Sequence, residues 1–324
     1  MTRRRVVGAI GVVVAVVVAV VVAVGVAAIL LRTAFAPAGT PAAAIGGVRP
    51  SYGPAVTAAV PNMNAITRRF WVPGLTAWYN PQGLAVLDGA VLVSAYRSQD
   101  SGVFRGPCRV FRLAPDGGEE TGDVDVPLPC GHAGGLAAAG ADALYVADTH
   151  TLFAISPAQA FAGPMPAFRR FPLGPGLIGA LALSAPGAIW LGTYRENGPG
   201  RLYRFSAATL AGLPDGEALT LAYASAAIEI PSYAQGAALG PHGGLWVARS
   251  DTRWGELDRI EPATGAVERR YAVAAGIEGI AFDREGRLWA VSEAGARHTY
   301  DGFFAALVTP FFPLVFAIDP QRLE

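Results

Sequence analysis

Polar side chains stand at matching points along this chain, next to short apolar segments. Gln82, Gln235 and Glu278 each come directly before a glycine that opens such a segment. Amide and carboxyl oxygens are hydrogen-bonding groups and ligands for hard cations, and when buried they need partners. The pattern predicts a site for a polar ligand or ion, or else a water-filled channel whose lining satisfies itself. The candidate ligand-binding residues are Asn80, Gln82, His132, Asp148, His150, Arg195, Gln235, Arg249, Glu278 and Glu293.

These residues are spaced by a pattern that occurs five times from residue 79 onward. A second apolar piece follows the first in every copy, as in "AVLVSAYR" (90–97), and a third alternating piece follows that, as in "RVFRLAPDG" (109–117). Turn signals such as "DG" at 88–89 separate the pieces, so each piece is expected to be a strand. The first strand of each copy has a small residue in one shared column: Gly83, Gly135, Ala180, Gly236 and Gly279.

A fourth strand follows the first four copies but not the fifth. The fourth strands "AFRRFPL" (167–173) and "VERRYAV" (267–273) have the character of "TRRFWVP" at 67–73, which precedes the first copy. We expect 67–73 to complete the last sheet and so close a ring, which removes open sheet edges. The fold class is therefore all-β, a five-bladed β-propeller over 67–324. The alternative is a sixth blade within 206–231.

The predicted ring brings the candidate residues together. In a propeller, the loops that enter the first strands and leave the second strands surround one end of the central channel. All ten candidates lie in these loops or at the strand ends beside them. We therefore expect a shared polar mouth. His242 lies in a turn on the opposite face and is read as a turn residue.

Two cysteines fall within the first copy of the pattern. Cys108 opens its third strand and Cys130 ends its fourth. Antiparallel pairing makes these two points neighbours, so a disulfide between them is expected. The alternative is a pair of buried thiols.

The N-terminal region has a different composition. Arg3, Arg4 and Arg5 precede an uncharged, apolar run over 6–31, long enough for a spanning helix. The positive-inside rule makes 1–5 a cytoplasmic stub, 6–31 a transmembrane signal anchor in the lipid bilayer, and the rest extracytoplasmic. A cleaved signal peptide is the alternative. Residues 32–66 are rich in Ala, Pro and Gly and are expected to be a linker. The predicted localisation is the cell membrane, single-pass.

Composition excludes some functions. All 25 basic residues are arginine, which rules out lysine Schiff-base chemistry. The formal net charge is zero, which gives no electrostatic reason to expect a nucleic-acid partner.

Segments such as "GLAVLDGAVLVSAYR" and "GIEGIAFDREGRLWAVSEAG" resemble extracytoplasmic propellers of the NHL-repeat and senescence-marker-protein–gluconolactonase group. That resemblance implies a divalent cation such as Ca²⁺ in the channel, with Glu278, Asn80 and Asp148 as the matching metal ligands. The middle copies lack the family's paired Asn ligands and have Gly134 and Gly179 on the inner column instead.

The function expected from the sequence is a membrane-anchored, extracytoplasmic propeller that acts as a ligand-binding or interaction module at its channel mouth. The partner there is a small polar molecule, a glycan or a peptide. The alternative is a metal-dependent hydrolase of the lactonase or esterase type. A glycosidase would need two opposed carboxylates. The tryptophans that could stack on sugars fall instead in one second-strand column, typical of packing between blades: Trp190, Trp246 and Trp289.

Overall fold

The computed structural model describes residues 16–20, 23, 39–98, 106–163, 166–179, 181–302, 307 and 309–324. The chain forms two compact units, Met1–Gly39 and Thr40–Glu324. In the first unit the described residues 16–20 and 23 are helical. Within the described part of the chain, no helix is both long and apolar enough to cross a membrane. Most of the predicted span 6–31 lies outside the described residues, so the anchor stays a prediction.

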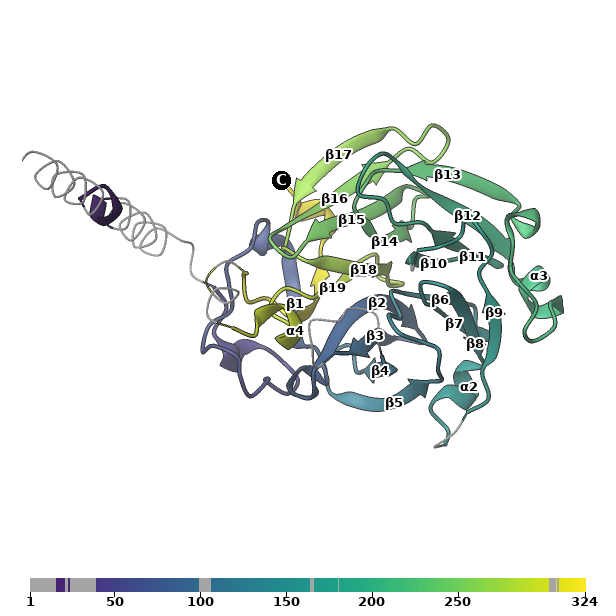
Figure 1. The fold of residues 1–324 in the computed structure, drawn as a ribbon, viewed down its shortest axis with the longest axis horizontal. Coiled ribbons are helices and arrows are strands. Elements are labelled where there is room, and N and C mark those ends of the chain that lie inside the picture. The colour runs from purple at the N-terminus through teal and green to yellow at the C-terminus, as the bar shows by residue number, and fades with distance from the viewer. Residues whose placement is uncertain are drawn as a thin grey trace, which may run out of the picture. The chain divides into compact units, whose positions relative to one another are not determined.

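The second unit is a β-propeller. Its described residues form five antiparallel sheets of four strands each (Figure 1). Blade 1 contains β2 (Tyr79–Leu87), β3 (Ala90–Arg97), β4 (Cys108–Leu113) and β5 (Glu120–Val126). Blade 2 contains β6 (Gly135–Ala139), β7 (Ala143–Ala147), β8 (Thr151–Ile155) and β9 (Arg169–Pro172). Blade 3 contains β10 (Leu181–Ala185), β11 (Ala188–Gly192), β12 (Gly200–Ser206) and β13 (Ala226–Ile230). Blade 4 contains β14 (Ala234–Leu239), β15 (Leu245–Asp251), β16 (Trp254–Ile260) and β17 (Val267–Ala272). Blade 5 contains β18 (Ile277–Phe282), β19 (Leu288–Ser292), β20 (Leu314–Ile318) and β1 (Ile66–Trp71).

In the described part of the propeller unit, the helical segments are short. The α-helical turns are α2 (Pro157–Ala160), α3 (Ala207–Gly212) and α4 (Arg297–Tyr300). The 3₁₀ turns are η1 (Ala42–Ala44), η2 (Met63–Ala65), η3 (Leu75–Ala77), η4 (Leu221–Tyr223) and η5 (Pro320–Arg322).

Tight turns fix the strand register where the sequence predicted them. Asp88 and Gly89 both adopt left-handed backbone conformations, with φ of 48° and 77°. This is the geometry of a two-residue hairpin whose twist matches that of the flanking strands. The hairpin places Leu87 opposite Ala90 and sets the pairing of β2 with β3.

The ring closes as the sequence predicted. β1 pairs antiparallel with β20, and Phe70 lies opposite Val315. In Figure 1 the purple β1 lies beside the yellow end of the chain, although the two strands are far apart in sequence. The Phe70 ring stacks on Trp289 of β19 at a centroid distance of 5.7 Å, so the added strand also fills the core of blade 5.

Glycines allow the first strands to approach one another around the axis. A Cβ added to Gly279 would lie 2.2 Å from the backbone nitrogen of Leu84, and one added to Gly236 would lie 2.3 Å from the carbonyl oxygen of Glu278. Real Cβ contacts are essentially never this short. At these two glycines the missing side chain lets neighbouring first strands approach closely.

The segment 206–231 does not form a sixth blade. It contains α3, η4 and β13, and β13 is the fourth strand of blade 3. The Ser206 hydroxyl caps α3 by accepting a hydrogen bond from the Thr209 backbone nitrogen at 3.0 Å. In the described chain, residues 207–225 form a long connection from β12 to β13 within blade 3.

The expected linker 32–66 is not a free tether over its second half. From Thr40 on, these residues belong to the propeller unit. Gly46 forms a parallel bridge with Phe70, so the segment covers the outer edge of β1. Ile45 and Val60 are buried in the same apolar cluster as Phe316. The small and apolar residues of this stretch pack against the propeller, although their composition suggested a flexible linker.

Candidate functional site at the channel mouth

A cavity of about 370 Å³ lies at the predicted mouth of the channel. Its walls come from the beginnings of the first strands and the ends of the second strands. The described lining is Gln82, Tyr96, His132, Gly134, Thr149, Ile178, Gly179, Leu181, Tyr194, Glu196, Ala234, Gln235, Glu278 and Glu293. Five of the ten sequence candidates are therefore in the wall: Gln82, His132, Gln235, Glu278 and Glu293.

Left-handed residues turn the chain into the first strands at this mouth. Tyr233 has φ of 59° and Gly276 has φ of 59°, and each comes two residues before a cavity-lining side chain, Gln235 or Glu278. A bulky residue in this region is strained, and such strain is typical of segments held by their surroundings. The Tyr233 backbone nitrogen donates to the Arg195 carbonyl oxygen at 2.7 Å, and its carbonyl accepts from the Ser250 nitrogen.

Glu293 joins blade 5 to blade 1 inside the cavity. Its Oε2 accepts hydrogen bonds from Asn80 Nδ2 at 2.9 Å and from Gln82 Nε2 at 3.0 Å. Burial raises the pKa of this carboxyl, and the two amide donors oppose that rise by favouring the charged form. Asn80 Nδ2 also donates to the Tyr96 hydroxyl at 2.9 Å. Asn80 Oδ1 is buried and accepts no hydrogen bond from the residues that the structure describes.

Glu278 is the most unusual group in the wall. Glu278 is 2% exposed. Its pKa is affected by burial and by the charge of Glu293, and by no hydrogen bond from the described residues. Burial, together with the nearby Glu293, raises the pKa of Glu278 well above its usual range. The carboxyl therefore keeps its proton at pH values where an exposed glutamate is charged. It faces the cavity as a polar group with no protein partner in the described chain.

His132 and two tyrosines complete the polar lining. Burial lowers the pKa of His132 to about 4, although Asp148 opposes this, so the imidazole is neutral near pH 7. The His132 ring lies edge-on to Tyr96 at 5.5 Å. Burial and Glu196 raise the pKa of Tyr194 to about 12. The cavity thus combines neutral hydrogen-bonding groups with carboxyl groups.

Several predicted residues do not line the cavity. Arg249 donates to the Ser232 carbonyl oxygen and to Glu256, at 2.7 and 2.6 Å, and is part of an ion-pair network within blade 4. His150 and Arg195 are exposed and are not among the described lining residues. The sequence pattern predicted them at the mouth because they lie at strand ends. The direction of each side chain, however, depends on neighbours that the pattern does not reveal.

Asp148 lies behind the wall. Its Oδ1 accepts hydrogen bonds from the backbone nitrogens of Gly131, His132 and Ala133, at 3.1, 2.7 and 3.2 Å. The metal ligands implied by the family resemblance were Glu278, Asn80 and Asp148. They do not fit this structure, because the Asp148 carboxylate accepts hydrogen bonds from the backbone of a loop.

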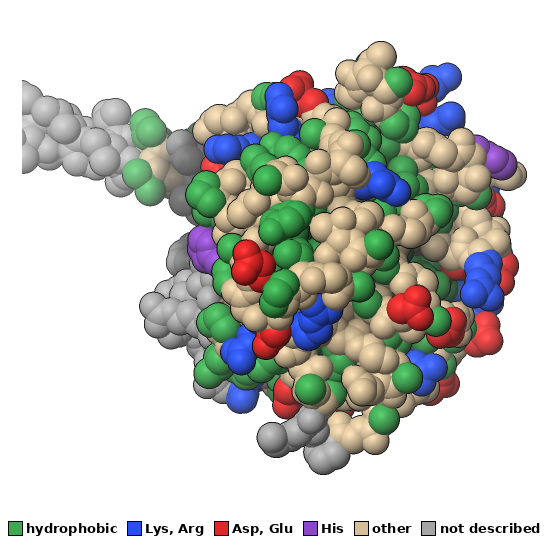
Figure 2. Space-filling model, turned by 90° about the vertical axis from the view of Figure 1, so that its right-hand side faces the viewer, with side chains coloured by type: hydrophobic (Ala, Val, Ile, Leu, Met, Phe, Trp, Pro, Cys, Tyr) green, Lys and Arg blue, Asp and Glu red, His purple; other side chains and the backbone are tan. Residues whose placement is uncertain are grey.

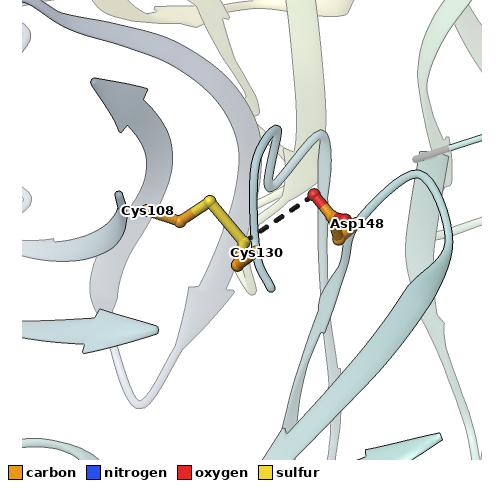
Figure 3. Close-up of side chains that lie close together, drawn as sticks. All are labelled: Cys108, Cys130 and Asp148. Atoms are coloured by element: carbon orange, nitrogen blue, oxygen red, sulfur yellow. Dashed lines mark hydrogen bonds between the residues drawn. A yellow bond between two sulfur atoms is a disulfide. The ribbon is translucent and has the colours of Figure 1, made fainter. Parts of the chain in front are cut away.

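The predicted disulfide is present. Cys108 and Cys130 are bonded, with Cα atoms 5.9 Å apart (Figure 3). Asp148 Oδ1 lies 3.8 Å from Cys130 Sγ. Within the described chain, Cys108, Cys130 and Asp148 are grouped closely enough to suggest a metal site. Both sulfurs are used in the disulfide, so this group does not offer thiolate ligands.

Tyr96, Tyr194 and Glu196 were not in the predicted set although they line the cavity. Tyr194 and Glu196 follow the second strand β11, and Tyr96 lies near the end of the second strand β3, so their positions resemble that of Glu293 after β19. On the face drawn in Figure 2, basic and acidic side chains are scattered among apolar ones.

The fold and the cavity define a five-bladed β-propeller with a carboxyl-containing site at one mouth. No protein-family model and no curated protein matches the chain. Among solved structures, Myxococcus xanthus glutaminyl cyclase is similar, with a TM-score of 0.51 and 16% identity over 78% of this chain and 94% of that one.

Two further similar structures have lower scores. A quinonprotein alcohol dehydrogenase-like protein from Bacteroides thetaiotaomicron has a TM-score of 0.40 and 13% identity, covering 75% of this chain and 56% of its own. The PQQ-bound aldose sugar dehydrogenase of Streptomyces coelicolor has a TM-score of 0.37 and 18% identity, covering 67% of this chain and 78% of its own. At such identities the likeness concerns the fold alone. The closer kinship with NHL-repeat and gluconolactonase-like propellers stays a prediction.

Proposed function

We propose that the channel-mouth cavity binds a small polar molecule that carries a protonated amine. The observation that carries this proposal is the Glu278 carboxyl, which is buried, faces the cavity beside Glu293 and has no partner among the described residues. A buried polar group without a partner is costly, and a ligand that supplies the partner recovers that cost. The cavity volume of about 370 Å³ lies in the range typical of small-molecule sites.

The charge of the wall favours an amine over an anion. On binding, Glu278 gives up its proton and the carboxylate pairs with the ammonium group, while Glu293 supplies a second negative charge nearby. Gln235, Tyr194 and the neutral His132 then provide hydrogen bonds that orient the rest of the molecule.

Calorimetry on the purified full-length protein tests the proposal. Glycinamide is the amine probe, and acetate and glucose are the controls. We expect binding of glycinamide alone, with an enthalpy that varies with the buffer because Glu278 releases a proton. Glu278→Gln should weaken binding about tenfold or more, in the range of a lost charged hydrogen bond. The exposed Glu229→Gln on β13 is the matched control and should bind like the wild type. Equal binding of glycinamide by both variants would contradict the proposal, and stabilisation by Ca²⁺ instead would favour a metal site.

A second candidate function is acid–base catalysis in the same cavity. Two neighbouring carboxyls whose environments differ are suited to opposite roles, Glu278 as the acid and the amide-bonded Glu293 as the base. The name of the Myxococcus xanthus neighbour suggests an N-terminal glutamine as the substrate to try. The α-amino nitrogen would attack the side-chain amide carbon and pass a proton to Glu293. Ammonia would leave with the proton of Glu278. Mass spectrometry of a Gln-Ala peptide would detect the loss of ammonia, and an unchanged peptide would reject this candidate.

We further propose that residues 6–31 anchor the protein in a membrane with the propeller on the extracytoplasmic side. The Cys108–Cys130 disulfide supports this, because disulfides persist in oxidising compartments. Alkaline extraction of membranes and a C-terminal alkaline-phosphatase fusion test it. The protein should stay in the membrane fraction and the fusion should be active. Release by alkali or an inactive fusion would contradict the anchor or its orientation.

A further inference from the structure

The loop between β5 and β6 holds one wall of the cavity, and two independent connections hold the loop. The first is the carboxylate of Asp148, which accepts the three consecutive backbone N–H groups of residues 131–133. Such a concave set of N–H groups is a known anion-binding arrangement, filled here by a side chain of the protein itself.

The second connection is the Cys108–Cys130 disulfide, which ties the start of this loop to the first residue of β4. The Gly106 backbone nitrogen adds a hydrogen bond to the Gly131 carbonyl oxygen at 3.1 Å. Ala133, at the other end, has a left-handed φ of 49°, and its carbonyl accepts a bond from the Ser94 hydroxyl at 2.6 Å. An alanine stays in this unfavourable region only when its surroundings hold it.

The two connections meet, as Figure 3 shows: Asp148 Oδ1 lies 3.8 Å from Cys130 Sγ. Between the anchored ends stands His132, whose ring packs against Tyr96 and lines the cavity. Neither Asp148 nor the disulfide lines the cavity, yet both act on the residue that does.

We propose that Asp148 and the Cys108–Cys130 disulfide together position His132, so that the channel-mouth site is formed only in the oxidised protein. This inference rests on the proposed amine-binding function of the same site. Reduction by a dithiol would transfer two electrons and two protons to the sulfurs, break the S–S bond and leave the dithiol as its own disulfide. The freed Cys130 would no longer hold the loop over Asp148, and the His132 wall would open.

Hydrogen exchange of the full-length protein tests, without any ligand, whether Asp148 and the disulfide hold the loop 131–133 in place. We follow the peptide 127–136 by mass spectrometry, with the β14–β15 turn at 240–244 as the internal control. Dithiothreitol, Cys108→Ser with Cys130→Ser, and Asp148→Ala should each speed exchange of 127–136 about tenfold or more, because hydrogen bonds to a charged group are lost. The control peptide should not change. Asp148→Asn keeps one acceptor oxygen and should restore part of the protection, which also covers the case in which the other variants do not fold.

Glycinamide calorimetry well below the unfolding temperature supplies the second measurement. Affinity should fall about fivefold or more on reduction and recover on reoxidation, as expected for lost preorganisation. Unchanged exchange in 127–136 on reduction and in Asp148→Ala would show that Asp148 and the disulfide do not hold the loop 131–133. Faster exchange with unchanged affinity would overturn the positioning of the site. Failure of the oxidised wild type to bind any amine would reject the proposed function. The exchange result alone would then decide whether Asp148 and the disulfide hold the loop 131–133.

Discussion

Gln82 and Glu293 are 211 residues apart in the chain, yet Gln82 Nε2 lies 3.0 Å from Glu293 Oε2. The contact crosses the junction between blade 1 and blade 5. Glu293 follows β19 of blade 5, the blade whose sheet is completed by β1, and β1 precedes Gln82 in sequence. Ring closure therefore does more than seal a sheet edge, since it assembles the part of the cavity that contains the carboxyl groups.

Removing the Phe70 ring should weaken ring closure. Phe70 is 3% exposed and stacks on Trp289, so Phe70→Ala should lower the free energy of unfolding by about 3–5 kcal/mol. Urea denaturation measures the change. Val267→Ala on the exposed β17 is the control, because Val267 is 42% exposed and should cost little. Similar losses in both variants would show that β1 does not contribute as described.

The inner glycine column should tolerate no side chain. Gly279→Ala would place a Cβ 2.2 Å from the Leu84 nitrogen, a backbone atom that cannot move without the strand, so we expect loss of folded protein or a large fall in melting temperature. Gly212→Ala, where an added Cβ meets nothing within 4 Å, is the control. A stable Gly279→Ala protein would mean that the first strands are not packed as closely as in this structure.

Stability should depend on His132 at acidic pH. Its pKa is about 4 in the folded state and 6.5 in the unfolded chain, so the unfolded state binds more protons between these values. Stability is therefore lost as pH falls from 6.5 to 4, by up to about 3 kcal/mol from this residue. His132→Gln should remove that part of the slope. Denaturation curves at several pH values compare the two proteins, and parallel slopes would contradict the prediction.

Glu278 should act in the opposite direction. Because its folded-state pKa is raised above the ordinary value of 4.5, its contribution becomes unfavourable as pH rises above 4.5. Glu278→Gln has nearly the same shape and carries no charge. Its melting temperature should exceed that of the wild type by an amount that grows from pH 5 to pH 8. A difference that is constant with pH would indicate that the carboxyl is not buried in a neutral form.

Much of the fold was predictable because propeller repeats are local. Each copy contains its own strands, turns and small-residue column, and the resemblance of 67–73 to the fourth strands predicted the β1–β20 pairing. The disulfide was predictable for the same reason, since both cysteines belong to one blade. The packing of 40–66 was not, because its partners lie in strands at the other end of the chain.

The sequence by itself determined the blade pattern, the closing strand and the end of the channel at which polar groups gather, because these follow from periodicity along the chain. Only the tertiary structure decided which of those groups form the site. Asp148, Arg249 and Glu278 all appeared as polar residues near strand ends, yet backbone N–H groups engage Asp148, carboxylates engage Arg249, and Glu278 faces the cavity. The direction and the partner of a polar side chain depend on atoms brought near it by other blades, and no spacing within one segment contains that information.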